Sequence, residues 1–366
     1  MNKKFFMGIA AMAALTLVSC SSDDLNSLSD NSSKNEAISF DGYLGRSAVA
    51  VNGSRGSEVK IDQLKTGGFG VFGNYSKETT TAYGNSLFDN QQVTYDNDKS
   101  KWTYSPLKFW PSDGHIDFLA YAPYNAGTFE NTYHLKFNVS ETITKQKDLL
   151  YAKTVGQTMA KNSGTNKVSF KFNHALSRLG YSVKLNGTCS PDATITLKKI
   201  TLAGSAPEPT TGTTTEPTGA FHKTGTIDLS TGNWTTTSDK QAFKWFSAET
   251  LGSQSITFTS AFNTSTSNKT YTNKDDEYLF VIPQNFSGTN ELYVIVEYTI
   301  QYTGVKGPDG QPATMTNKVY KQLSYNFEQG KAYTINLTIG RPIDFDVNAE
   351  ITPWEKDTTI PEIPMD

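Results

Sequence analysis

The order of apolar and polar residues from position 37 onward predicts an all-β protein. Short runs in which every second residue is apolar recur along the chain, and clusters of Gly, Pro, Asn and Asp separate them. A period of two places alternate side chains on one face of a strand, where they can cover a core. Strands are predicted at 38–44, 68–74, 116–121, 168–172, 181–185, 194–202, 255–262, 278–282, 292–302 and 333–339. Many short strands between turn residues favour β-sandwiches.

Three segments depart from this simple alternation. Residues 292–302 (LYVIVEYTIQY) are apolar on both faces, which predicts a central strand. Residues 174–179 (HALSRL) carry the only helical signal, and the Thr- and Pro-rich residues 204–219 are expected to form an exposed loop. We place a domain boundary near residue 180, which gives an N-terminal β-sandwich over 37–180 and a C-terminal β-sandwich over 181–366.

Residues 1–19 have the layout of a lipoprotein signal peptide. Two lysines precede an apolar run of 14 residues, which is too short to span a bilayer about 30 Å thick. The run ends in LVSC, which resembles a bacterial lipobox with Cys20 as the acylated first mature residue. A thiol is needed there because its thiolate is the nucleophile. The alternative is an ordinary signal peptide with an incidental cysteine. Residues 20–36 are polar without a period and predict a flexible tether.

Length and charge narrow the possible functions. Removal of residues 1–19 from the 366-residue chain leaves 347 residues (366 − 19), a length that favours two domains. The chain has 33 basic and 36 acidic residues and no long basic run, so we expect no nucleic-acid partner. The aromatic content of 12% would suit sugar binding by stacking, but no cluster of Trp, Arg and acidic residues defines a sugar site.

No motif in the chain indicates catalysis. None of the four histidines forms an H-x-x-x-H or H-E-x-x-H pair, so a zinc site is not expected. The sequence also lacks the G-x-S-x-G motif of hydrolases. We therefore expect no catalytic residues, no metal and no cofactor.

The two ends of the chain carry the most informative pattern. Near the C-terminus, apolar and polar residues alternate strictly, and the apolar set is Ile343, Phe345, Val347, Ala349 and Ile351. Such a strand, within the terminal segment 341–366, could fill an apolar groove in another molecule and form backbone hydrogen bonds there.

Removal of a shorter strand near the start of the chain could open such a groove. Ile38, Phe40 and Leu44 share one face, and two arginines, Arg46 and Arg55, follow in a loop of small residues. Such loops are readily cut by proteases. Removal of the first strand would open a β-sandwich for a neighbour's strand. The alternative is that both end strands belong to their own domains.

Taken together, these segments resemble the fimbrillin family of Bacteroidales, which includes the Mfa-like fimbrillins of type V pili. The resemblance covers essentially the whole mature chain. Its pieces are the lipobox (17–20), ISFDGYLGR (38–46), SRG (54–56), GGFGVFGNY (67–75), LKFWP (107–111), DFLAYAPY (117–124), DLLYAKT (148–154), FKFNHALSRLGYSV (170–183), KAYTINLTIG (331–340) and ITPW (351–354).

The resemblance implies two transthyretin-like β-sandwich domains in tandem and assembly into pili on the cell surface. It implies export to the outer membrane as a lipoprotein precursor, acylated (for example palmitoylated) at Cys20. An arginine-specific protease would then remove the first strand, and other pilin subunits would be the partners in donor-strand exchange. Arg55 matches the family's cleaved arginine best, with Arg46 second.

The sequence is also compatible with other roles. The chain could be a stalk, tip or anchor subunit, and an anchor would keep its lipid. It could instead be a surface lipoprotein that binds glycan or acts as an adhesin without polymerising. An enzyme is the third class.

Cys20→Ala is expected to leave the precursor without lipid and in the wrong compartment, because the tether alone offers no means of membrane attachment. Metabolic labelling with a fatty-acid analogue measures this. Equal label in the variant and the unaltered protein would show that another residue is acylated.

Overall fold

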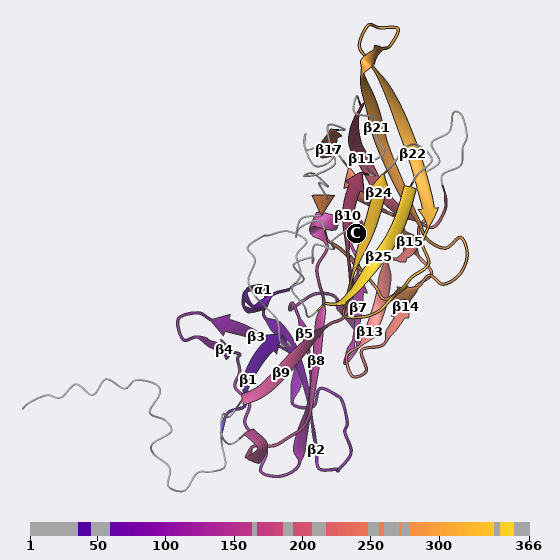
Figure 1. The fold of residues 1–366 in the computed structure, drawn as a ribbon. Coiled ribbons are helices and arrows are strands. Elements are labelled where there is room, and N and C mark those ends of the chain that lie inside the picture. Colours follow the sequence, from indigo (N-terminus) through magenta and orange to yellow (C-terminus); the bar gives the residue numbers. More distant parts are fainter. Residues whose placement is uncertain are drawn as a thin grey trace, which may run out of the picture.

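Strands dominate the fold (Figure 1). The computed structural model describes residues 36–44, 59–162, 167–185, 193–206, 217–247, 256–259, 271–272, 278–339 and 345–354. Its helices there are α1 (Ile61–Gly67) and the short 3-10 turns η2 (Ile143–Lys145) and η3 (Ala160–Asn162). The predicted all-β class is confirmed. Within these ranges no helix has the length and apolar character that crossing a membrane requires.

A seven-stranded sheet forms the N-terminal part. In order across the sheet, its strands are β1 (Ser39–Leu44), β9 (Lys167–His174), β8 (Leu150–Gln157), β5 (His115–Ala122), β2 (Phe69–Ser76), β3 (Phe88–Asp96) and β4 (Lys101–Thr103). Every pair is antiparallel except β1–β9, which is parallel. Because β1 also contacts β4 from the opposite end of this order, the sheet curls around its own core.

Phenylalanine side chains fill that core. On β9 the alternation in the sequence becomes an alternation in burial, with Val168, Phe170 and Phe172 buried and the residues between them exposed. Phe69 and Phe118 are fully buried on the neighbouring strands β2 and β5. Burial of each such side chain stabilises the fold by about 1.5–3 kcal/mol, so these side chains together contribute strongly to the stability of the N-terminal sheet.

Two five-stranded sheets enclose a second core. The first has the order β18 (Tyr271–Thr272), β10 (Ser177–Leu185), β24 (Lys331–Ile339) and β25 (Phe345–Pro353), with β19 (Leu279–Val281) also on β10. The second has the order β16 (Phe243–Ser247), β11 (Ala193–Ala203), β21 (Tyr293–Lys306) and β22 (Pro312–Gln322), with β17 (Ile256–Thr259) also on β11. β21 lies between β11 and β22, so the predicted central position of residues 292–302 is confirmed. The β21–β22 hairpin projects beyond the other strands (Figure 1).

One of the smaller sheets connects the two parts of the chain. A four-stranded sheet has the order β14 (Trp234–Thr236), β13 (Thr224–Asp228), β7 (His134–Asn138) and β6 (Thr128–Asn131). Its β7–β13 pair therefore joins residues about ninety positions apart, from Asp228↔His134 to Thr224↔Asn138. Two-stranded pairs are formed by β12 (Phe221–His222) with β15 (Lys240–Gln241), and by β20 (Gln284–Asn285) with β23 (Asn326–Phe327).

The chain passes from the seven-stranded sheet into another sheet at residues 174–177. β9 ends in the seven-stranded sheet at His174, and β10 begins in a different sheet at Ser177. The predicted boundary at residue 180 lies inside β10, and the β6–β7 hairpin of the predicted N-terminal domain extends a sheet with β13. The division into two transthyretin-like domains stays a prediction.

The helical signal at residues 174–179 is wrong. Leu179 pairs with Leu279 on β19 and with Tyr333 on β24, so this backbone is already part of a sheet. Ala175, Leu176 and Leu179 are fully buried. The apolar residues of this segment have a helical spacing over six positions. Pairing with distant strands nevertheless sets the backbone conformation and overrides local propensity.

Candidate functional site

The strand that the sequence singled out at the start of the chain is a built-in part of the first core. β1 pairs with β9 from Ser39↔Lys167 to Leu44↔Phe172. On its other side, the Ile38 amide donates to the Lys108 carbonyl over 2.8 Å, and Ala37 forms a bridge with Phe109. The segment 36–44, which contains β1, is therefore inserted between β9 and residues 108–110, and its loss would leave both neighbours with unpaired backbone groups.

Phe40 is the centre of this insertion. Its side chain is 2% exposed, and its ring contacts four others at centroid distances of 5.3–5.7 Å. Those rings belong to Phe88, Tyr104, Phe118 and Phe170. Aromatic pairs at these distances contribute about 0.5–1.5 kcal/mol each beyond their buried area. Ile38 is 1% exposed, and Leu44 packs on the same core. The structure thus brings Ile38, Phe40 and Leu44 together.

A half-buried hydroxyl also holds the residue before β1. Tyr104 Oη donates to the carbonyl of Ile38 over 2.6 Å. Burial raises the pKa of Tyr104 and outweighs the opposing effect of the Lys108 backbone, so the hydroxyl stays a neutral donor at neutral pH. Nothing in the sequence indicates this role of Tyr104, because it depends on a contact with a residue 66 positions away in the chain.

At the other end of the chain, β25 lies at the edge of its own sheet. It pairs with β24 along its whole length, from Lys331↔Pro353 to Ile339↔Phe345. The register places Val347 opposite Leu337 and Ala349 opposite Ile335, so the alternation in β25 matches that of its neighbour. Ile351 is 56% exposed although its partner Tyr333 is buried.

The remaining predicted site residues lie outside the described residues. These are Cys20, Arg46, Arg55 and Ile343. Acylation, cleavage and donation by residues 343–351 therefore stay predictions. In the uncut chain, β1 pairs with β9 and β25 pairs with β24, so each end strand pairs within its own molecule.

A tryptophan fixes the end of β25. Trp354 is 2% exposed, and its amide donates to the Gly330 carbonyl over 3.2 Å. Its ring stacks on His174 at 4.0 Å with an angle of 4° between the planes, and on Phe280 at 5.5 Å. The Arg178 guanidinium lies 5.6 Å from the Trp354 ring centroid. The sequence signals were the ITPW and FNHALSRLG segments, but nothing in them indicated that His174 and Trp354 touch.

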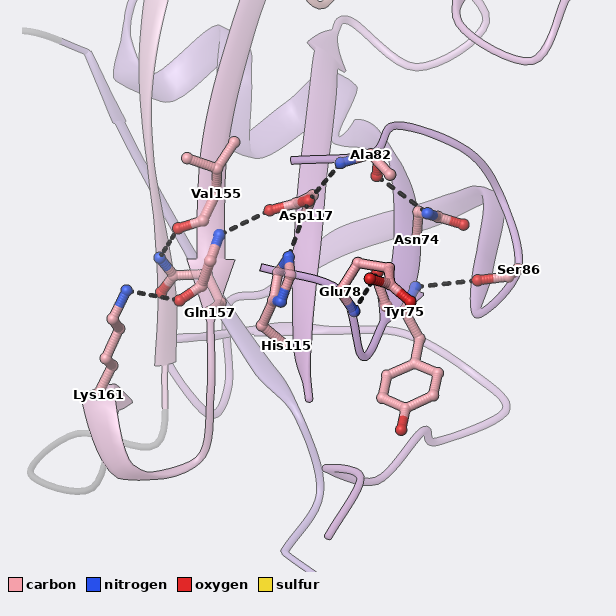
Figure 2. A network of polar contacts seen from close by, with 12 residues as sticks. Asn74, Tyr75, Glu78, Ala82, Ser86, His115, Asp117, Val155, Gln157 and Lys161 are labelled. Atoms are coloured by element: carbon pink, nitrogen blue, oxygen red, sulfur yellow. Dashed lines mark hydrogen bonds and ion pairs between the residues drawn. The ribbon is translucent and has the colours of Figure 1, made fainter. Parts of the chain in front are cut away.

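Buried carboxylates elsewhere hold loops in place. Asp117 on β5 accepts hydrogen bonds from the amides of Ala82 (2.8 Å) and Gly156 (2.7 Å), and from His115 Nε2 (3.1 Å). Figure 2 shows this arrangement, with the Ala82 loop and the Gln157 turn on either side of the carboxylate. All these partners belong to the chain itself, so Asp117 acts as a loop anchor. Within the described ranges, no group of three or more His, Cys, Asp or Glu side chains could hold a metal ion.

Comparison with known proteins gives one family. A family model described as fimbrillin-like matches residues 59–354. A fimbrial protein from Bacteroides vulgatus has a similar structure, with a TM-score of 0.61 at 21% identity over 87% of this chain and 99% of that chain. A proposed cell adhesion protein from Bacteroides ovatus gives a TM-score of 0.48 at 17% identity over 87% and 98%. A search of curated protein sequences found no match.

Phe40→Ala is expected to destabilise the N-terminal sheet by about 3–5 kcal/mol, because it empties the centre of an aromatic core. Tyr43→Ala is the matched control on the same strand, since Tyr43 is 47% exposed, and it should change stability by less than about 0.5 kcal/mol. Urea denaturation measures both. Equal effects of the two changes would contradict the central position of Phe40.

Asp117→Asn is expected to lower the free energy of unfolding by about 1–3 kcal/mol, because an amide cannot accept all three hydrogen bonds of the carboxylate. Asp113→Asn is the control. Asp113 is exposed and bonds Tyr75 and Lys77, so its loss should matter little. Thermal unfolding of the two variants tests this, and an unchanged midpoint for Asp117→Asn would contradict the anchoring role.

Proposed function

The chain belongs to the fimbrillin-like family, and on that basis we propose that it is a structural or adhesive subunit of a pilus on the cell surface. The observation that carries the proposal is the position of β1. This strand completes the first core, and its link to the rest of the chain contains both candidate cleavage arginines. The family match begins at residue 59, after both arginines, and leaves β1 outside it.

The proposed route to assembly starts from a lipoprotein precursor. Acylation of Cys20 holds the precursor at the outer membrane, and an arginine-specific protease cuts after Arg55, or alternatively after Arg46. The cut separates β1 from the chain. Loss of Ile38, Phe40 and Leu44 then exposes the backbone edge of β9 and an apolar groove lined by phenylalanine rings.

The proposed occupant of this groove is residues 343–351 of another subunit. Each buried apolar side chain stabilises by about 1.5–3 kcal/mol, so five alternating positions supply on the order of 10 kcal/mol before ordering costs. β25 suits this role because it is an edge strand and loses pairing on one side only when it leaves. The opposing cost is its ladder with β24 and the burial of Trp354.

The proposal assigns no catalytic activity to the protein. Asp117 is the buried carboxylate of β5. It accepts hydrogen bonds from two backbone amides and one histidine, which gives it a structural role. A purified sample that hydrolyses a peptide or glycan would refute this part. Saturable glycan binding by the protein, with no fibres on the cell, would refute the pilus subunit itself.

Phe345→Asp and Val347→Asp are expected to abolish polymers, because a charged side chain at an inward position of the donor strand cannot be buried in the groove. Asn348→Asp is the matched control, since this residue occupies the alternate, polar position of the same strand. High-mass ladders on unboiled gels measure polymerisation, and circular dichroism checks the fold. Ladders from folded and trimmed Val347→Asp protein would exclude this strand as the donor.

The amino terminus of the protein recovered from the cell surface tests the cleavage step. A start at Gly56 is expected for a polymerising subunit cut after Arg55, and a start at Ser47 would indicate Arg46. A start at Cys20 would instead identify an anchor or a simple lipoprotein. N-terminal sequencing separates the three outcomes.

A further inference from the structure

Three segments that are far apart in the sequence meet at Asp148. Its side chain is fully buried, and Oδ2 accepts a hydrogen bond from the amide of Val59 over 3.0 Å. The same oxygen lies 2.8 Å from Nδ1 of His174. Because a carboxylate can only accept, the Nδ1 of His174 carries the proton in this contact.

His174 also contacts Trp354, the residue directly after β25. Its ring lies flat on Trp354, at 4.0 Å and an angle of 4°. Trp354 has little freedom of its own, because Phe280 stacks with it at 5.5 Å and the Arg178 guanidinium lies 5.6 Å from its centroid. Asp148 therefore fixes the orientation of the imidazole through a hydrogen bond, and the imidazole in turn packs against Trp354.

The two ends of this chain of contacts are the two segments that assembly would change. Val59 is the first described residue after Arg46 and Arg55, and a cut after Arg55 would leave a new amino terminus at Gly56, three residues before it. Trp354 directly follows β25. Val59 belongs to the first core and Trp354 to the second, so this chain of contacts links the two cores.

We propose that Asp148 and His174 couple the segment entering at Val59 to the C-terminal strand β25, so that disturbing that segment loosens the strand. The physical reason is the shared oxygen. Val59 and His174 donate to one atom, Asp148 Oδ2, whereas Oδ1 has no hydrogen-bond partner in the described part of the chain. Loss of the Val59 donor leaves the buried carboxylate with a single donor among the described residues, which changes the position and strength of the remaining bond to His174.

The biological meaning of this coupling rests on the proposed function. In the uncut precursor it keeps β25 in its own subunit, where it cannot enter a neighbour. After trimming, the segment at Val59 is a chain end, and the strand is released more easily. The coupling itself is a property of the uncut chain and can be measured without any polymer.

Val59→Pro tests the coupling in the full-length precursor, because proline lacks the amide hydrogen that Asp148 accepts. Hydrogen–deuterium exchange of the β24–β25 ladder is the measurement. We expect exchange in residues 345–353 to become at least about five-fold faster. Val59→Ala is the control, because it removes the side chain but keeps the amide, and it should leave exchange in β25 within about two-fold of the unaltered chain.

His174→Phe tests the route. Phenylalanine keeps a flat ring against Trp354 but cannot donate to Asp148, so Val59→Pro should add no further acceleration in this background. Equal acceleration by Val59→Pro in both backgrounds would overturn the route through His174. Faster exchange at residues 59–64 with β25 unchanged would overturn the coupling altogether.

A reciprocal measurement decides the question if Val59→Pro does not fold. Coupling between two sites acts equally in both directions, so Trp354→Leu should accelerate exchange at residues 59–64. Unchanged exchange there would overturn the proposal. Failure of the proposed function looks different, since the precursor would then show the coupling but form no polymers. Polymers without coupling would refute only the present inference.

Discussion

The first core is complete only while residues 36–44, which include β1, lie between β9 and residues 108–110. Phe40 meets four aromatic rings, and Tyr104 holds the backbone beside it. A strand in the middle of such a packing is costly to remove, yet β1 is attached to the rest of the fold only through residues 45–58. The stability of the first core therefore depends on β1, whereas the covalent connection of β1 to the other strands depends on residues 45–58.

The class of the fold was accessible from the sequence because burial in this protein follows a period of two. On β9 the buried residues are those that the alternation selects, and on β24 they are the alternating residues together with Ala332. β22 was not among the predicted strands because none of its residues is fully buried and its apolar alternation is weak, and its register with β21 makes it a strand. The helical signal at 174–179 failed for a related reason, since pairing with β19 and β24 decides the backbone there.

The candidate site was accessible only in part. Ile38, Phe40 and Leu44 could be grouped from their spacing, because one strand contains them all. Asp148, His174 and Trp354 could not be grouped, because the contact between His174 and Trp354 joins residues 180 positions apart (354 − 174) and stems from how two sheets meet. Local patterns indicate which residues face a core, but they carry no information on which cores touch.

The β7–β13 pair gives the molecule a mechanical property. Five residue pairs of this ladder, from His134–Asp228 to Asn138–Thr224, connect a hairpin of the first half of the chain to a strand of the second. A tensile load applied at opposite ends of the protein is therefore carried by these backbone hydrogen bonds as well as by the single covalent link near residue 175. The two halves should stretch and yield together, as one elastic element, instead of swinging about a hinge.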